Sequence, residues 1–278
     1  MTKYLDWPME VSIETLAKCN AACVFCPYPT LDRQGEKMPD AMLDRIVEEL
    51  KDCPHRFIIS PFKVNEPFLD KRLLPFCRKV MAELPNAMLR LFSNGSALTE
   101  KHLRQVNDLE RVFHLWVSLN THDPEEYKRV MSLDFERTAA NLDRLHAMMA
   151  RKEFGHPVVV SKVMEGKKRS IPDEAFVLYC LDRWPLFDVF TIKRDSWLGN
   201  IDADEAPIPD APCNRWNELS ITATGVVALC CMDGKAEYPI GDLNMQTFYE
   251  VYNLSVYRER WEKQMSRLDV PVCSGCNY

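Results

Sequence analysis

The segment Cys19-Asn-Ala-Ala-Cys23-Val-Phe-Cys26 places three thiols in one short loop, directly after an apolar run at residues 11–13. Thiolates at such short spacing can bind one metal centre if the loop folds around it. A structural zinc site needs four protein ligands, and the next cysteine and the first histidine come only at Cys53 and His55. Three thiolates on a four-iron cluster would leave one iron open to a further ligand.

Outward from this loop, short β-like runs alternate with longer helical ones. The predicted strands cover residues 11–13, 57–59, 89–92, 112–119, 158–163 and 189–192. The predicted helices cover residues 40–50, 72–84, 125–131, 137–151 and 173–183. Six such alternations predict an α/β fold with a parallel sheet, either open or partly closed as a barrel. In these sheets the chemistry lies at the C-terminal ends of the strands.

The pattern changes near residue 200. Residues 203–212 contain three prolines and three acids and are predicted to be a linker. Beyond them, residues 219–222 and 226–229 flank a Gly-containing turn and predict a hairpin, and residues 246–265 predict a helix. We therefore expect two domains, residues 1–200 and 201–278.

Charge and composition exclude several classes of function. The 278 residues carry 35 Lys and Arg against 41 Asp and Glu, a net charge of −6, with no basic run for nucleic acid or anionic lipid. The N-terminus lacks a signal-peptide pattern, and no apolar stretch approaches the roughly 20 residues that span a bilayer. We expect a cytoplasmic protein that binds neither nucleic acid nor membrane.

Eleven cysteines are many for such a chain, and they are clustered. A second set lies near the C-terminus, in which Cys273 and Cys276 have the spacing of a metal-binding pair. Its other members are Cys213 and either Cys230 or Cys231, because neighbours on a strand point to opposite faces. Four thiols would suit an iron–sulfur cluster or zinc. The scattered cysteines are expected to be small buried apolar residues, namely Cys53, Cys77 and Cys180.

At Cys19, Cys23 and Cys26 the chain resembles the radical S-adenosylmethionine (SAM) superfamily, whose Cys-x3-Cys-x-aromatic-Cys loop is matched with Phe25 as the aromatic residue. The resemblance implies a partial (β/α)6 barrel. It also implies a 4Fe–4S cluster whose open iron binds the amino and carboxylate groups of SAM. SAM is then cleaved to a 5′-deoxyadenosyl radical, which abstracts hydrogen from the substrate.

Three further motifs of the superfamily follow in order, so that the resemblance covers roughly residues 8–200. Asn65-Glu66-Pro67 resembles its Gly-Glu-Pro motif, in which the acid binds the SAM amino group, although Asn65 replaces glycine. Ser93-Asn94-Gly95 is similar to its Thr-Asn-Gly turn, and Ser118-Leu119-Asn120 to its ribose-binding strand end. The implied SAM-binding residues are Phe25, Asn65, Glu66, Ser93, Asn94, Ser118 and Asn120.

The C-terminal segment resembles the SPASM/Twitch group of this superfamily. Cys213-x11-Gly225-x4-Cys230 matches the opening of the group's motif, and the chain ends soon after Cys276. The resemblance implies the shortened, Twitch-like α+β domain with one auxiliary 4Fe–4S cluster. Its four ligands would be Cys213, Cys230, Cys273 and Cys276, and it would conduct electrons or act as a brace.

An electron acceptor beside a hydrogen-abstracting radical favours net oxidation. The chain is in this respect similar to Twitch-bearing dehydrogenases of aminocyclitol and aminosugar pathways, which oxidise a secondary alcohol to a ketone. We therefore expect a small-molecule substrate and a flavodoxin- or ferredoxin-type electron donor. The candidate substrate-pocket residues are Lys162, Lys193, Arg194, Asp195, Trp197 and Arg215.

Three alternatives remain open. A peptide-modifying maturase is less favoured, because the barrel begins within about ten residues of the N-terminus and leaves no room for a leader-binding domain. In a redox-neutral epimerase a thiol returns hydrogen to the substrate radical, and Cys231 is the candidate donor. A non-catalytic iron–sulfur carrier or zinc protein would leave the three-thiol loop and the six alternations unexplained.

Overall fold

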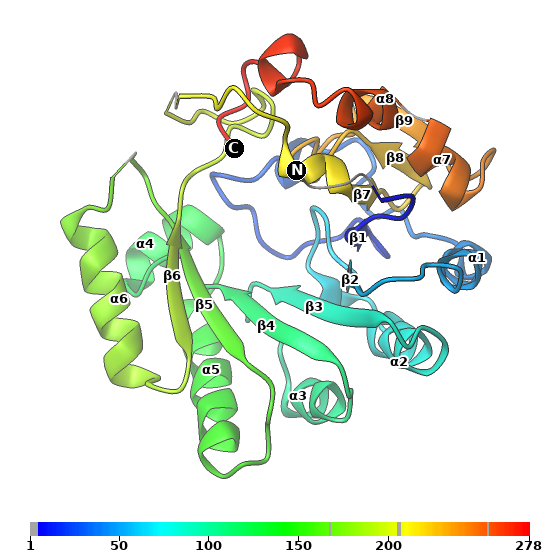
Figure 1. Cartoon of the computed structure of the whole chain (residues 1–278). Coiled ribbons are helices and arrows are strands. Elements are labelled where there is room, and N and C mark those ends of the chain that lie inside the picture. Colours follow the sequence, from blue (N-terminus) through cyan, green and yellow to red (C-terminus); the bar gives the residue numbers. More distant parts are fainter. Residues whose placement is uncertain (1–4, 167, 205–206, 255) are drawn as a thin grey trace.

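A computed structural model describes residues 5–166, 168–204, 207–254 and 256–278. Its strands form one sheet in the order β6-β5-β4-β3-β2-β1-β7-β8-β9. Each pair of neighbouring strands from β6 to β7 in this order is parallel. The pairs β7–β8 and β8–β9 are antiparallel. Figure 1 shows this sheet curving into a partial barrel, with α1 to α6 around the outside.

The bounds of the elements are as follows. The strands are β1 (Glu10–Ile13), β2 (Phe57–Ser60), β3 (Ala87–Ser93), β4 (Val112–Ser118), β5 (Val158–Val163), β6 (Asp188–Ile192), β7 (Glu218–Ile221), β8 (Val226–Ala228) and β9 (Pro239–Asp242). The helices are α1 (Asp40–Leu50), α2 (Leu73–Glu83), α3 (Glu100–Asn107), α4 (Pro124–Met131), α5 (Phe135–Ala150), α6 (Ile171–Arg183), α7 (Phe248–Leu254) and α8 (Val256–Glu262).

The predicted α/β class, the parallel sheet and the C-terminal hairpin are confirmed. Two elements are additional to the prediction. The helix α3 buries only Leu103 and Val106, so its apolar pattern is weak, and Thr99 caps its start. The short edge strand β9 begins at a proline, which is tolerated at an edge. Residues 205–206 of the predicted linker and residue 255 of the predicted C-terminal helix lie outside the described residues.

Alternation along the strands gives the sheet two different faces. Residues such as Val11, Ile13, Leu89 and Leu91 face the helices and are fully buried in the main core. The residues between them face the concave side, and several are polar, including Glu10 and Arg90. Parallel strands are usually apolar on both faces, so the polar concave face marks a functional surface.

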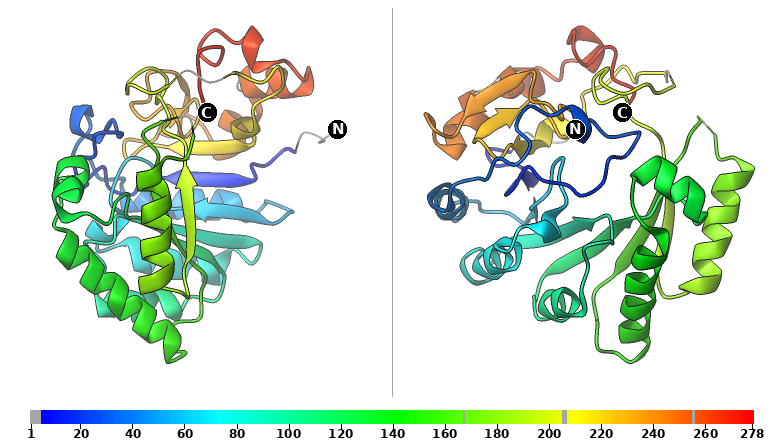
Figure 2. Two further views of the ribbon diagram at one scale, coloured as in Figure 1. Left: turned by 90° about the vertical axis from the view of Figure 1, so that its left-hand side faces the viewer. Right: turned by 180° about the vertical axis from the view of Figure 1, so that it is seen from behind.

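The C-terminal region continues the barrel sheet. The strand β7 pairs with β1 in register from Glu10 opposite Glu218 to Ile13 opposite Ile221. A smaller core lies beyond it, formed by Trp216, Leu229, Trp261, Val270 and Cys273. Figures 1 and 2 show the chain returning at its C-terminus to the segment that leaves β6. No helix among the described residues has the length and apolar character to cross a membrane.

Candidate iron–sulfur centres

The three-thiol loop follows β1 and is fastened to the end of α4. The backbone N–H of Ala22 donates to the carbonyl of Met131 at 3.1 Å, and that of Val24 to the carbonyl of Val130 at 3.0 Å. Between these bonds, Cys23 Sγ lies 3.3 Å from Met131 Sδ. The loop is therefore held against the barrel on the side where β4 leads into α4, at the C-terminal ends of the strands.

The three thiols of this loop interact with one another. Burial raises the pKa of Cys19 to about 11 and that of Cys26 to about 12. Burial also raises the pKa of Cys23, and negative charge on Cys26 and Cys19 raises it further. Thiolates so placed repel each other, so a positively charged iron centre is the partner that would stabilise all three. The donor set thus fits a cluster.

Among the residues that the structure describes, no three Cys, His, Asp or Glu side chains converge on a point suited to one metal ion. In a four-iron cluster each thiolate binds a different iron, so the thiols surround a larger space than a single ion does. For the C-terminal set, the spacing of the cysteines left zinc open, and the auxiliary cluster followed from the resemblance to the SPASM/Twitch group.

Glu66 is the central acid of the expected SAM site. Its carboxylate is buried and accepts hydrogen bonds from Phe68 N at 3.2 Å, Ser93 Oγ at 3.0 Å and Asn94 N at 2.6 Å. Burial raises its pKa to about 7, against the effect of these donors. All three donors are uncharged, so among the described residues no cation is paired with this buried carboxyl group, which leaves it able to accept from a charged donor. The Nδ2 of Asn65 is likewise buried, and none of the described residues accepts a hydrogen bond from it.

The turn after β3 connects Glu66 to the three-thiol loop. Asn94 donates through Nδ2 to Asn20 Oδ1 at 2.9 Å, and the same nitrogen lies 4.0 Å from Cys19 Sγ. Gly95 has φ +79°, and an added Cβ would meet Thr138 and Val117 at 3.0 Å, so glycine is required there. The structure thus brings Glu66, Ser93 and Asn94 together beside Cys19. Sequence analysis did not identify Asn20, although it lies inside the cysteine motif.

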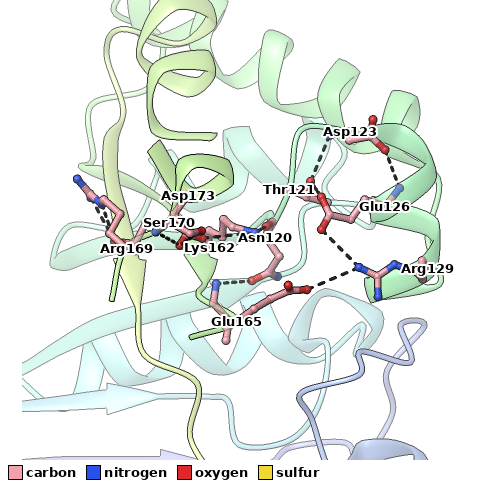
Figure 3. A network of polar contacts seen from close by, with 12 residues as sticks. Asn120, Thr121, Asp123, Glu126, Arg129, Lys162, Glu165, Arg169, Ser170 and Asp173 are labelled. Carbon is pink, nitrogen blue, oxygen red and sulfur yellow. Dashed lines mark hydrogen bonds and ion pairs between the residues drawn. The ribbon is translucent and has the colours of Figure 1, made fainter. Parts of the chain in front are cut away.

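Asn120 is held by protein contacts, as Figure 3 shows. It has φ +69° and is buried; its Oδ1 accepts from Val163 N at 3.0 Å, and its Nδ2 lies 3.1 Å from Met131 Sδ. Lys162 donates to the carbonyl of Asn120 at 3.0 Å and pairs with Asp173 on α6 at 3.7 Å. The Lys162 ammonium is therefore bound by Asn120 and Asp173, on the helix side of the sheet and away from its concave face. Ser118 is half-buried at the end of β4.

The second cysteine set gathers around one cavity in the C-terminal region. Cys213, Cys230, Cys273 and Cys276 all line it, together with apolar residues that include Trp216, Leu198 and Leu229 and with the polar residues Arg215, Arg267 and Tyr278. The Nη1 of Arg267 lies 3.9 Å from Cys213 Sγ. Burial raises the pKa values of Cys273 and Cys276, and negative charge on Cys213 raises both further. The four thiols therefore share one cavity with two guanidinium groups, whose positive charge suits an anionic cluster bound by four thiolates.

Cys231 is not among the residues that line this cavity. Burial raises its pKa to about 12, and the charges that act on it most are those of Arg215 and Glu218. The pair Cys230 and Cys231 is thus divided, with Cys230 beside the other three thiols and Cys231 under the charges of Arg215, which precedes β7, and Glu218, at the start of β7.

The segment of residues 193–197 ties the two cysteine sets together. Arg194 donates to the carbonyl of Val24 at 3.0 Å, and Trp197 Nε1 to that of Phe25 at 2.9 Å. On the other side, the segment contacts Asn277, next to Cys276. Lys193 donates to the carbonyl of Asn277, and Asn277 Nδ2 donates to that of Arg194 at 3.1 Å. Lys193 and Arg194, which we expected in a substrate pocket, are here bound to the backbone of both sites.

A polar cluster lies on the concave face, and Arg215 is the one member of it that was predicted from the sequence, as a substrate-pocket residue. Glu10 accepts from Ser60 Oγ at 2.7 Å and from Arg90 Nη1 at 2.6 Å, and Arg215 pairs with Glu218 at 2.6 Å. Burial raises the pKa of Glu218 to about 7. A cavity of about 330 Å³ opens beside Glu10 and Glu218. The signal in the sequence was the alternation of polar with apolar residues in β1, β3 and β7.

Comparison with known families identifies both parts of the chain. Residues 13–161 match the radical SAM superfamily, and residues 213–277 match an iron–sulfur cluster-binding domain called SPASM. An S-adenosyl-L-methionine-dependent 2-deoxy-scyllo-inosamine dehydrogenase from Niallia circulans is 31% identical over 101 residues, which are 36% of this chain. The match spans 40% of that relative's length.

Two solved structures share the fold. BtrN in complex with AdoMet and 2-DOIA has a TM-score of 0.65 at 18% identity, covering 100% of this chain and 95% of that chain. Streptococcus suis SuiB bound to its precursor peptide SuiA has a TM-score of 0.70 at 12% identity, covering 89% of this chain and 65% of that chain.

Proposed function

This chain belongs to the radical SAM superfamily, and on that premise we propose that it dehydrogenates a small carbohydrate- or aminocyclitol-like alcohol. The observation that carries the proposal is the pairing of an open three-thiol site with an enclosed four-thiol cavity. The partial similarity to the Niallia circulans dehydrogenase supports the substrate class. Residues 1–200 would form the catalytic barrel and residues 201–278 the Twitch-like cluster domain.

The first site is suited to hold SAM. When bound, SAM and its 4Fe–4S cluster supply the carbon radical that takes a hydrogen atom from the substrate. Cys19, Cys23 and Cys26 would hold the cluster, and Glu66 would accept hydrogen bonds from the SAM ammonium. Asn65 has a free donor beside Glu66. The other residues that we expect to contact SAM lie at the C-terminal ends of β3 and β4 or in the three-thiol loop. They are Phe25, Ser93, Asn94, Ser118 and Asn120.

The second site is suited to electron transfer. Oxidation of a secondary alcohol to a ketone removes one hydrogen atom, then one proton and one electron. Every iron of an auxiliary 4Fe–4S cluster would be bound by one of the four thiolates of Cys213, Cys230, Cys273 and Cys276. The substrate could then not bind to iron, and the cluster would act only as an electron acceptor. Lys193, Arg194 and Trp197 would keep the two clusters at a fixed separation. A flavodoxin- or ferredoxin-type protein would supply the electron that starts each turnover.

Product analysis in deuterated water tests this proposal. Reduced enzyme, SAM and candidate aminocyclitols should give one 5′-deoxyadenosine for each product, and the product should be lighter by two hydrogens. Replacing Cys273 and Cys276 together by alanine should preserve SAM cleavage and prevent product formation, because the substrate radical would lose its electron acceptor. A product of unchanged mass would contradict dehydrogenation, and turnover of peptides alone would favour the maturase that the likeness to SuiB leaves open.

The position of Cys231 favours a second candidate, redox-neutral epimerisation. Its thiol lies apart from the four-thiol cavity and beside Arg215 and Glu218, where it could return a hydrogen atom to a substrate radical. An epimerase would incorporate one deuterium from solvent into a product of otherwise unchanged mass, and Cys231→Ala would stop that incorporation. The dehydrogenase should keep forming its oxidised product in the same variant.

A further inference from the structure

Lys63 is a buried cation on the concave face that neither cluster site has so far explained. It follows β2 and is 3% exposed. Its ammonium donates to Ser220 Oγ at 3.0 Å, to the carbonyl of Asp233 at 2.9 Å and to the carbonyl of Cys230 at 3.4 Å. The side chain thus crosses from the barrel to the turn that carries one of the four cysteines of the second site.

The positive charge of Lys63 lacks a direct counter-charge. All three of its acceptors are uncharged oxygens. Two acids act on Lys63 without forming an ion pair with it: Glu14, which pairs with Arg33 at 2.6 Å, and Asp233, whose carboxylate accepts from three backbone N–H groups. A buried cation without a direct ion pair is stabilised further by any negative charge that forms beside it.

The thiols beside Cys230 can provide that charge. The Lys63 ammonium lies 3.4 Å from the carbonyl of Cys230, and the side chain of Cys230 lines the four-thiol cavity. A four-iron cluster bound by four thiolates is an anion, and it gains one more negative charge when it is reduced. A buried cation stabilises the reduced form more than the oxidised form, and net charge is one of the factors that set cluster potentials.

Lys63 also connects the two sites mechanically. Its backbone N–H donates to Asn65 Oδ1 at 3.0 Å, and Asn65 precedes Glu66. On the other side, Gly234 packs so closely on Pro27 and Trp197 that a Cβ would lie 2.7 Å from Pro27. The Cys230–Gly234 turn is thereby fixed between the SAM-site loop and the three-thiol loop.

We infer that Lys63 is a positioning residue that holds the Cys230 turn and raises the reduction potential of the auxiliary cluster, making that cluster a better electron acceptor. The inference rests on the proposed function, because it requires a cluster at Cys213, Cys230, Cys273 and Cys276. It adds a residue of the barrel to the control of a cofactor in the C-terminal region.

The test measures the midpoint potential of the auxiliary cluster alone. The parent is the full chain with Cys19, Cys23 and Cys26 replaced by alanine, reconstituted anaerobically and titrated by electron paramagnetic resonance. Lys63→Met should shift the midpoint to more negative potential by at least ~59 mV, a tenfold change for a one-electron couple. Lys63→Arg should restore most of the parent value. Lys235→Met is the matched control, because Lys235 lies in the same turn but is partly exposed, and solvent screens its charge.

A Lys63→Met potential equal to that of Lys235→Met would overturn the inference. If Lys63→Met does not retain iron, Lys63→Gln provides the same comparison, since it keeps a hydrogen-bond donor without the charge. Loss of iron from both neutral variants, with normal iron in Lys63→Arg, would support the dependence on positive charge. A parent that binds no cluster would overturn the proposed function, and the inference with it; a loaded parent with an unshifted potential overturns the inference alone.

Discussion

The two cysteine sets differ in how much of the chain is needed to build them. Cys19, Cys23 and Cys26 belong to one loop, whereas the other set takes Cys213, Cys230 and the pair Cys273 and Cys276 from three separate segments. The first set can therefore be recognised from local spacing. The second exists only after β7, β8 and the C-terminal turns have packed around Trp216 and Leu229.

The two sets also differ in what surrounds them. Beside the first set lie the buried carboxyl group of Glu66, which has only uncharged hydrogen-bond donors, and the buried Nδ2 of Asn65, which has no acceptor among the described residues. Around the second lie apolar side chains, the chain's own cysteines, and the guanidinium groups of Arg215 and Arg267. The difference between the sites is therefore in the number of thiols and in the partners that are missing: three thiols beside an unsatisfied carboxylate leave a place for a ligand, whereas four thiols can occupy every iron of a cluster.

The largest expected effect comes from removing the open site. Replacing Cys19, Cys23 and Cys26 by alanine should abolish SAM cleavage and lower the iron content from about eight to about four per chain, since each 4Fe–4S cluster holds four irons. The second set has its own small core, so its cluster should remain. Iron analysis and 5′-deoxyadenosine assay check this. Loss of all the iron would mean that the second set binds no cluster of its own, which would overturn the proposed function, and unchanged SAM cleavage would end the superfamily-based mechanism.

A smaller effect is expected from the polar wall of the open site. Glu66→Ala removes a charge-assisted hydrogen bond to the SAM ammonium, at a cost of about 1.5–3 kcal/mol, or roughly 10- to 150-fold in the dissociation constant. Both clusters should stay in place. Equilibrium binding of SAM to the reconstituted protein measures this. A dissociation constant within about twofold of wild type would make Glu66 an ordinary buried acid.

The same residue predicts how SAM binding depends on pH. Burial raises the pKa of Glu66 from 4.5 to about 7 in the ligand-free protein, and SAM should prefer the ionised carboxylate. Affinity should therefore fall by up to about tenfold per unit as the pH drops below about 7, because a proton must first leave. The ligand-free protein has the opposite dependence: the contribution of Glu66 to stability is present below pH 4.5 and is lost as the pH rises through 7. Glu66→Gln should flatten both curves.

The comparison also separates what sequence could predict from what it could not. The six barrel strands and the meeting of Glu66, Ser93 and Asn94 follow from local patterns plus one rule, that parallel strands bring their C-terminal ends together. Arg215 and Glu218 form a local pair three residues apart in the sequence. The contact of Glu10 on β1 with Arg90 on β3, and the position of Glu218 opposite Glu10, depend instead on the register of the strands across the sheet. That register is fixed by packing between distant segments, and no local spacing encodes it.

The roles of Lys193 and Lys63 were beyond the sequence for the same reason. Both are basic residues that follow a predicted strand, so both have the pattern of a substrate-binding residue. Their partners are backbone carbonyls of Asn277, Cys230 and Asp233, which belong to segments far away in the chain. A cation's partner is thus a tertiary property, even where its strand is predictable.

The smallest expected effect is the one that distinguishes the neighbouring residues Cys230 and Cys231. Cys230 lines the four-thiol cavity and Cys231 does not, although adjacent residues cannot be told apart by spacing. Cys230→Ala should lower the iron content from about eight to about four per chain, because the auxiliary cluster loses a ligand, whereas Cys231→Ala should leave iron and the cluster spectrum unchanged. Reconstitution of both variants side by side, with iron and sulfide analysis, compares them directly. If Cys231→Ala lost the iron and Cys230→Ala kept it, Cys231 would be the ligand in place of Cys230. The four-thiol cavity would then have to reorganise around the Cys230–Gly234 turn when it binds iron, and the hydrogen bond from Lys63 to the carbonyl of Cys230 would not position a cluster ligand.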